Sequence, residues 1–443
     1  MADDTVDLAK QILSNPQALP TPAPTPAQMP QPNAGKRPQF QIQPQGGSIS
    51  GPVRPFPTVD PQKINMNSLG FAFDDAIAHH KSLDRADRVA NSNAAKAIMK
   101  KYKISSLLGK NEKLLKSEKG YKGEEPVKLP DGRGIETTGL PLAPAFEMGG
   151  FNTCPNHASC KDSCLGKTSG NYFKVGGGMD LSAFEGPRLN SLNKTLFMMN
   201  HAGAFATRLY DEIAAARHEA ENNGNHLGVR LNTLSDIHPR IHQSIIKSFP
   251  DVSFYDYTKM KYEPVASNHH YTYSSTGVSD PEVHNPHTNW HQMRRRLDNG
   301  DNVAMAFTDK EHLPETVHDQ ETGKTYRVIN GDMHDFRPLD TYGKSEGEEG
   351  VIVGLKNKKG FGKVGEAHKD SKGFFVKYDP GRTKTPKGTY EREESTELGP
   401  SGKPKLGATK ATNKQVVIAP QMRKQTPDLN NNNQVEKSNE TGA

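Results

Sequence analysis

Short apolar runs of the kind that form strands alternate with helical stretches between Ile135 and Lys359. The strand-like runs lie at residues 227–232, 252–258, 271–275, 302–307, 326–330 and 350–355. Candidate helices lie between them at 192–221, 236–249 and 280–299. Strands that alternate with helices are most simply joined as parallel βαβ units. The sequence therefore predicts an α/β fold, specifically a partial or complete parallel α/β barrel of the TIM type.

The flanking parts of the chain divide into an arm, a helical segment and a tail. Residues 1–62 are rich in Pro and Gln and lack apolar periodicity, which predicts a disordered arm. Residues 63–134 combine helical spacing of apolar residues with many lysines, which predicts a helical Lys-rich extension. Residues 361–443 are rich in Gly, Lys, Glu and Asn, so we expect a basic, mostly disordered tail. One folded domain is expected over residues 135–360.

The net charge of +6 is unevenly distributed along the chain. From Lys356 onward 18 Lys and Arg stand against 10 Asp and Glu, and residues 96–119 hold eight lysines against two glutamates. Such segments are typical of solvated surfaces, and they also permit weak contact with a nucleic acid or another polyanion. The sequence has no signal-peptide pattern and no run of 18 apolar residues, so we expect a cytoplasmic protein without membrane contact.

All three cysteines of the 443-residue chain, Cys154, Cys160 and Cys164, fall within the segment CPNHASCKDSC. Three thiolates in one turn-rich loop are the soft ligands that zinc and iron–sulfur clusters require. Three cysteines cannot all pair internally, and a long chain has little need of disulfides. A metal centre is therefore the leading interpretation, and three thiols in an ordinary loop are the alternative.

These residues leave the identity of the metal open. A [4Fe–4S] cluster held by three cysteines has one iron without a protein ligand, which is a coordination site for a substrate or cofactor. His157 offers instead a fourth ligand for zinc, and a closed site with three cysteines and one histidine is usually structural. The first arrangement indicates an enzyme, and the second indicates support for the fold.

Polar residues follow the predicted strands at their C-terminal ends, where parallel α/β proteins carry their functional sites. The candidate catalytic residues are Asp236, Asp256, Lys259, Asp332 and Asp335, and the candidate cofactor-binding residues are Arg230, Asn232, Ser274 and Arg337. Some have a plainer interpretation. Asp236 is equally suited to cap a helix, and Asp335 is suited to pair with Arg337 within a turn. The sequence lacks the motifs of Walker loops, Rossmann folds, HExxH proteases and GxSxG hydrolases.

The chain resembles the phage gene product 88 family, whose members have no determined activity. The resemblance covers about residues 140–360 and is carried by the ordered segments LAPAFEMGGFNTCPNHASCKDSCLG, RLNSLNKTLFMMN, VRLNTLSDI, FPDVSFYDYTK, TYSSTG, VINGDMHDFRPLD and IVGLKNK. It implies a phage protein of the host cytoplasm. It also implies that the family's motif positions are occupied here by Cys154, Cys160, Cys164, Arg188, Arg230, Asn232, Asp236, Asp256, Tyr257, Lys259, Asp332, Asp335 and Arg337.

A more distant similarity is to radical S-adenosylmethionine enzymes, in which three cysteines in a loop after the first barrel strand hold a [4Fe–4S] cluster. Those enzymes usually space their cysteines C-x₃-C-x₂-C, whereas this chain has C-x₅-C-x₃-C. The similarity implies an iron–sulfur enzyme that binds S-adenosylmethionine and an unknown substrate. The alternative is a zinc-stabilised accessory protein without catalytic activity, which contacts a nucleic acid or another polyanion through its basic segments.

Overall fold

The structure is a computed structural model of the whole chain. It describes residues 55–59, 64–120, 125–144, 151–157, 160, 186–278, 288–309, 311–341, 348–357, 374–381, 392–398, 404–409 and 413–418. The helices are α2 (Met66–Ser82), α3 (Arg85–Lys101), α4 (Glu112–Lys119), α6 (Pro187–Asn200), α7 (Ala202–Asn222), α8 (Gln243–Ser248) and α9 (Trp290–Asp298), with the 3-10 turns η6 (Pro239–Ile241) and η7 (Arg337–Thr341). None of the described helices is both long and apolar enough to span a membrane.

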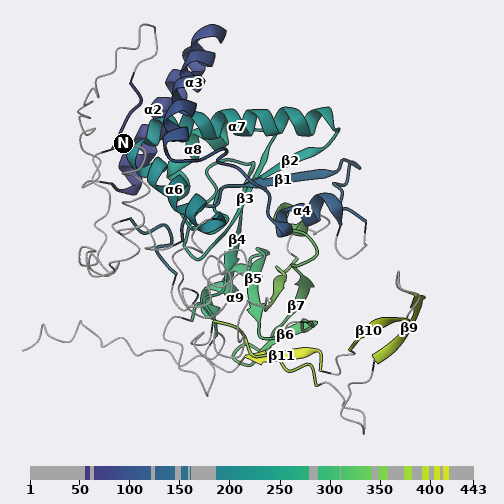
Figure 1. Ribbon diagram of the computed structural model, residues 1–443. Helices are drawn as coiled ribbons and strands as arrows, with labels where there is room; N and C mark the ends of the chain where they lie inside the picture. The colour runs from purple at the N-terminus through teal and green to yellow at the C-terminus, as the bar shows by residue number, and fades with distance from the viewer. Residues whose placement is uncertain are drawn as a thin grey trace, which may run out of the picture.

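Nine of the described strands form one sheet (Figure 1). Their order across the sheet is β1 (Ile135–Gly139), β2 (His226–Arg230), β3 (Ser253–Thr258), β4 (His269–Ser274), β5 (Val303–Phe307), β8 (Ile352–Lys356), β7 (Thr325–Asn330), β6 (Thr316–Asp319) and β11 (Gln415–Ile418). Neighbours are parallel from β1 to β7, β6 is antiparallel to β7, and β11 is parallel to β6. The predicted parallel α/β sheet is therefore present. Among the described strands no pairing joins the edges β1 and β11, so closure into a barrel is not shown.

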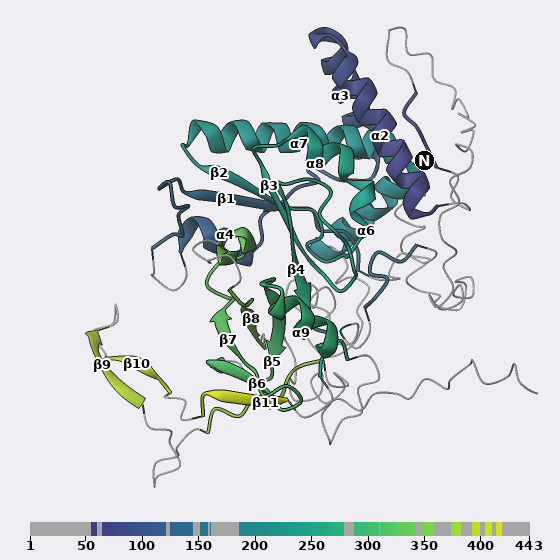
Figure 2. The same cartoon turned by 180° about the vertical axis from the view of Figure 1, so that it is seen from behind.

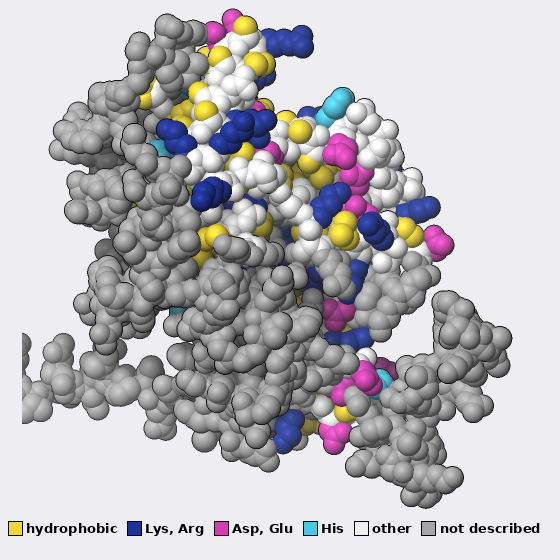
Figure 3. Space-filling model, viewed as in Figure 1, with side chains coloured by type: hydrophobic (Ala, Val, Ile, Leu, Met, Phe, Trp, Pro, Cys, Tyr) yellow, Lys and Arg dark blue, Asp and Glu magenta, His cyan; other side chains and the backbone are white. Residues whose placement is uncertain are grey.

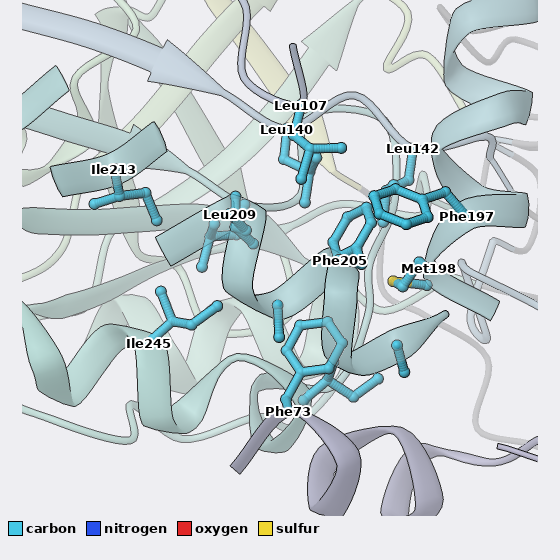
Figure 4. Packing of buried hydrophobic residues seen from close by; sticks show 14 of the residues in the cluster. Phe73, Leu107, Leu140, Leu142, Phe197, Met198, Phe205, Leu209, Ile213 and Ile245 are labelled. Atoms are coloured by element: carbon cyan, nitrogen blue, oxygen red, sulfur yellow. The ribbon is translucent and has the colours of Figure 1, made fainter. Parts of the chain in front are cut away.

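A helical layer covers one face of β1, β2 and β3 (Figures 1 and 2). Alternate residues of a strand point to opposite faces, and Val229 of β2 and Phe254 of β3 point into this layer. There they join a core that includes Phe73 of α2, Phe205 of α7 and Ile245 of α8 (Figure 4). Helix α2 packs against α7 and η6, so the helical segment before the first strand is part of this layer.

The opposite face of these strands is covered by α4 and by the residues around η7. Leu114 of α4, Tyr255 of β3 and Phe336 form a small buried cluster there. Gly228 of β2 permits this packing, because a Cβ atom at residue 228 would lie 2.7 Å from the Phe336 ring. The same three strands thus have apolar groups packed on both faces.

All six predicted strand runs correspond to strands of the structure, namely β2, β3, β4, β5, β7 and β8. The predicted helix over 192–221 corresponds to α6 and α7, which meet at His201. The predicted helix over 280–299 is described only from residue 288 and is helical over Trp290–Asp298. Strand β1 was not predicted, because its sequence IETTG is polar although all five residues are buried.

The described parts of the tail include residues that the sequence did not assign to the fold. Strand β11 joins the sheet beside β6, and Val376 forms a β-bridge with Phe307 of β5. Two further strands, β9 (Arg392–Leu398) and β10 (Pro404–Thr409), pair with each other in an antiparallel manner. These described segments are therefore strands or strand contacts within a tail that was expected to be mostly disordered. The arm over 1–62 lies outside the described residues except for 55–59.

Candidate functional site

The turn that carries Cys154 lies at the C-terminal edge of the parallel sheet, beside the ends of β2 and β3. The carbonyl oxygen of Thr153 accepts a hydrogen bond of 2.7 Å from the amide of Asp236. The Cys154 thiol donates to the carbonyl oxygen of Leu234 at 3.5 Å, and the Asn156 side chain donates to the carbonyl oxygen of Lys259 at 2.9 Å. These contacts place the first cysteine on the same edge as the polar residues that follow β2 and β3.

Two of the three cysteines belong to the described residues. Cys154 and Cys160 are thiols rather than halves of a disulfide, and both are half-buried. Between them the His157 amide donates to the carbonyl oxygen of Cys154 at 3.2 Å, and the Cys160 amide donates to that of His157 at 3.0 Å. Cys164 lies outside the described residues. Among the described residues, which do not include Cys164, no three His, Cys, Asp or Glu side chains are arranged to hold a metal ion.

Asp256 and Asn232 form the buried centre of this edge on the face of the helical layer. The Asp256 carboxylate accepts from the Asn232 amide at 2.6 Å, and the Asn232 side-chain oxygen accepts from the Ser235 hydroxyl and the Ile237 amide at 2.9 Å. Burial raises the pKa of Asp256 to about 7, although the Arg230 guanidinium and the Asn232 amide favour the ionised form. Asp256 can therefore hold or release a proton near neutral pH.

Asp236 is bound to β3 rather than to a helix start. Its carboxylate accepts from the Thr258 hydroxyl at 2.7 Å and from the Lys259 amide at 2.9 Å. The residue that caps η6 is His238, so the interpretation of Asp236 as a helix cap is wrong. Burial raises the pKa of Asp236 despite these hydrogen bonds. Nearby, burial raises the pKa of Tyr262, and Asp236 and Cys154 raise it further.

The other predicted residues gather on the opposite face of the sheet. Asp335 is fully buried, and its carboxylate lies 3.2 Å from Arg230 and 3.2 Å from Lys113. Burial by itself would raise the pKa of Asp335, but the neighbouring cations Arg230, Lys113 and Arg337 lower it to about 2. The ring of Tyr257 lies beneath the same cations, with its centroid 4.7 Å from the Arg230 guanidinium carbon and 5.2 Å from the Lys113 nitrogen.

Arg337 and Asp332 are also engaged in buried contacts. The Arg337 guanidinium donates to the carbonyl oxygen of Asp335 at 3.3 Å and pairs with Asp340 at 3.2 Å. The Arg337 side chain therefore pairs with Asp340, and it contacts only the main chain of Asp335. One carboxylate oxygen of Asp332 accepts from the Lys356 amide at 3.0 Å, and the Asp332 carbonyl oxygen accepts from Lys116 at 3.0 Å.

The predicted residues thus occupy one edge of the sheet but two faces. Asn232, Asp236 and Asp256 lie toward the helical layer, whereas Arg230 and Asp335 lie on the other face. A pocket of about 420 Å³ at this edge is lined by Lys259 and by Asn156 of the cysteine turn. Ser274 contributes its carbonyl oxygen, which accepts from Asn289 at 2.9 Å. Arg188 of α6 is half-buried.

The sequence did not predict the contribution of α4. Lys113 and Lys116 belong to the lysine-rich segment that was expected to be a solvated face or a polyanion contact, yet both reach residues at the strand ends. Their spacing of three residues places them on one side of a helix, and Leu114 beside Lys113 is buried. This helical spacing of the two lysines was the feature of the sequence that could have indicated their shared contact with the sheet. In the space-filling view Lys and Arg side chains are spread over the described face, and toward the right they are mixed with Asp and Glu (Figure 3).

The fold and this edge define a mixed α/β protein with a mostly parallel sheet and a cysteine turn at the C-terminal ends of its strands. A family model described as gene product 88 matches residues 105–378, and the chain belongs to this family of phage proteins. No curated protein and no solved structure matches the chain. Similarity to radical S-adenosylmethionine enzymes is therefore not shown by these comparisons. The family match begins before α4 and so includes Lys113 and Lys116.

Proposed function

We propose that this protein is an iron–sulfur enzyme of the radical S-adenosylmethionine type, in which Cys154, Cys160 and Cys164 hold a [4Fe–4S] cluster. The observation that supports it most is the hydrogen bond between the Thr153 carbonyl oxygen and the Asp236 amide. This bond holds the cysteine turn at the C-terminal edge of a parallel sheet, where α/β enzymes place their reactive groups.

The donor chemistry fits a cluster, because Cys154 and Cys160 are half-buried thiols and thiolates are the usual cluster ligands. When bound, a cluster with three cysteine ligands would supply one-electron chemistry and an open iron. The chain itself contributes the polar residues at the sheet edge beside the cysteine turn. Asp256 holds a proton near neutral pH, and Asn232 fixes the orientation of its carboxylate.

The residues predicted to bind S-adenosylmethionine fit that role less well. Arg230 is held by Asp335 and Arg337 by Asp340, so neither guanidinium is available to pair with the carboxylate of a cofactor in this arrangement. We therefore base the proposal on the cysteine turn and the parallel sheet. Cofactor cleavage is tested separately from cluster binding.

The first experiment measures iron, zinc and sulfide in protein purified without oxygen. The proposal predicts brown protein with broad absorption near about 400 nm, iron and sulfide in similar amounts, and loss of both in Cys160→Ser. His157→Ala is the matched control from the same turn and should keep its iron. Colourless protein whose zinc is lost in both variants would instead establish the structural zinc site.

The second experiment tests the reaction type on cluster-loaded protein. Reduced protein is incubated with S-adenosylmethionine, and methionine and 5′-deoxyadenosine are measured by chromatography. Formation of both products in the wild type and their absence in Cys160→Ser is expected. Cluster-loaded protein that leaves S-adenosylmethionine intact would contradict the radical type while retaining the iron–sulfur site.

A further inference from the structure

The exposed side of α3 carries four cations without a carboxylate partner. Arg85, Lys96 and Lys100 are exposed, and the helical repeat places them within about 60° of one another around the helix axis. Lys101 is also exposed and lies at the edge of the same side. None of the four forms an ion pair with a carboxylate of the described residues. We call this positively charged side the basic face of α3.

Acidic groups near α3 are engaged in other contacts. Asp84 caps the helix by accepting from the Asp87 amide at 2.9 Å, and Asp87, the only acidic residue of α3, is half-buried. On α7, against which α3 packs, the carboxylates of Asp211 and Glu212 lie 3.5 and 3.3 Å from the Arg208 guanidinium. The sequence from 88 to 111 contains no Asp or Glu. The basic face is therefore not balanced by these carboxylates.

Helix stability alone does not explain these cations. Lys100 lies in the last turn of α3, where a cation interacts favourably with the helix dipole. Arg85, however, is the first residue of the helix, where a cation is unfavourable, and Lys96 lies four residues before Lys100, a spacing at which like charges repel. Helix α7 instead carries mixed charges at this spacing, such as the pair of Arg217 and Glu221 at 3.0 Å. The charges of α3 therefore indicate a negatively charged partner.

The remainder of the basic face is small and polar. Asn93 is exposed there, together with Ala86, Ala90 and Ala97. Small side chains allow another surface to approach the backbone of a helix closely, and an amide side chain offers both a donor and an acceptor. This face is therefore suited to a partner that surrounds the helix closely.

The opposite side of α3 is fixed to the protein. Ala95 and Met99 belong to the main core, and α3 packs there against α7. Helix α3 lies at the periphery of the helical layer and projects beyond it (Figures 1 and 2). The protein thus presents a helix that is held on one side and exposed on the other.

We propose that the basic face of α3 binds double-stranded DNA in the major groove. This groove is about 12 Å wide and admits one α-helix. Lysine and arginine side chains neutralise the phosphates on either side of the groove, and the amide of Asn93 is of the type that pairs with the edge of adenine. The proposal does not depend on a metal at the cysteine turn.

The residues of α3 fit other polyanionic partners less well. The major groove of double-stranded RNA is deep and narrow and does not admit a helix. Single strands are bound largely by stacking of their bases on aromatic side chains, and α3 contains no aromatic residue. A helix that lies on a membrane needs several large apolar side chains on its exposed face, whereas Val89 is the only exposed large apolar residue of α3.

Fluorescence anisotropy with the full-length protein tests this proposal. The probes are a labelled DNA duplex of mixed sequence, the RNA duplex of the same sequence and one of the single DNA strands, each titrated at several salt concentrations. The DNA duplex should bind about tenfold more tightly than either of the other probes. Absence of binding to the DNA duplex at low salt, or equal or tighter binding of another probe, would overturn the proposal.

Two double variants that remove the same charge locate the contact. Lys96→Gln combined with Lys100→Gln should weaken DNA binding at least about tenfold and should reduce the slope of log K against log salt by about 2, because two phosphate contacts are lost. Lys119→Gln combined with Lys247→Gln, at exposed positions of α4 and α8, is the matched control and should keep the wild-type slope. Equal losses in both double variants, or no loss in the first, would overturn the proposal.

Ala97→Glu tests the same face without the removal of a lysine. A carboxylate on the basic face repels the phosphates, so DNA binding should weaken at least about tenfold. The variant should remain folded, because glutamate is a good helix former and lies four residues before Lys101. Circular dichroism and urea denaturation check the folding of each variant. Wild-type affinity in folded Ala97→Glu would place the DNA elsewhere and overturn the proposal.

Discussion

The ammonium group of Lys113 lies 3.2 Å from the buried carboxylate of Asp335, which joins α4 to the segment that follows β7. Arg230 of β2 shares the same carboxylate at 3.2 Å. The contact spans segments that are far apart in the sequence and lie on the sheet face opposite the helical layer. The family match begins at residue 105 and so includes α4, which completes this face.

Removal of one partner from this buried network should destabilise the protein. Asp335→Ala leaves two cations without their carboxylate, so we expect the free energy of unfolding to fall by about 3–5 kcal/mol. Lys113→Met should cost less, since Arg230 remains paired with Asp335. Urea denaturation measures both. The matched control is Lys119→Met, at an exposed position of the same helix, which should stay within about 0.5 kcal/mol of wild type. Equal effects at Lys113 and Lys119 would contradict the buried pair.

The low pKa of Asp335 predicts a specific acid sensitivity. Its pKa falls from 3.8 to about 2 on folding, so the unfolded chain binds the proton more readily. The ionised carboxylate therefore contributes stability above about pH 4, and this contribution, about 2 kcal/mol, is lost as the pH falls toward 2. Urea midpoints measured from pH 5 to pH 2 should decline less steeply in Asp335→Asn than in wild type. If the urea midpoints of the two proteins fall equally between pH 5 and pH 2, a group other than Asp335 causes the loss of stability in acid.

Asp256 predicts a dependence of the opposite sign. Its pKa rises from 3.8 to about 7 on folding, so the folded protein retains a proton that the unfolded chain has released. Its contribution is present below about pH 4 and is lost as the pH rises toward 7, with a magnitude of about 4 kcal/mol. Asp256→Asn should remove this loss between pH 4 and 7. The exposed Asp251→Asn serves as the control and should follow the wild-type profile.

The sequence predicted the parts of the fold whose residues are apolar. The runs of β2, β3 and β5 are apolar and buried, and their order with the helices indicated a parallel sheet. Strand β1 escaped prediction because its buried groups are polar and are satisfied by partners distant in sequence. The Thr137 hydroxyl, for example, donates to the Leu114 carbonyl oxygen at 2.6 Å. The sequence around a strand does not indicate a hydrogen-bond partner that is distant along the chain.

The predicted site residues lie at one edge of the sheet but are divided between its two faces. The choice of polar residues at the C-terminal ends of strands included Asp236, Asp256 and Lys259, which lie beside the cysteine turn. It also selected Arg230, whose position between the inward-facing Val229 and Leu231 places it on the other face. The alternation was visible in the sequence. For Lys113 the sequence offered only its helical spacing from Lys116, because the approach of α4 to Asp335 depends on tertiary packing.

Strand β11 allows a test of whether the tail contributes to the stability of the fold. Val416 and Ile418 are buried at 6% and 2% exposure, and β11 pairs with β6 along one edge of the sheet. Deletion of residues 421–443 leaves every described contact in place, so the free energy of unfolding should match that of the full chain. Deletion of residues 411–443 also removes both buried side chains, at a cost of about 3–6 kcal/mol.

The two truncated proteins are compared by urea denaturation and by gel filtration. The longer deletion also exposes the hydrogen-bonding edge of β6, and an exposed strand edge favours self-association. We therefore expect lower stability together with larger species at high protein concentration for the 411–443 deletion alone. Equal stability of the two proteins would show that β11 contributes nothing to the fold, and the sheet would then end at β6.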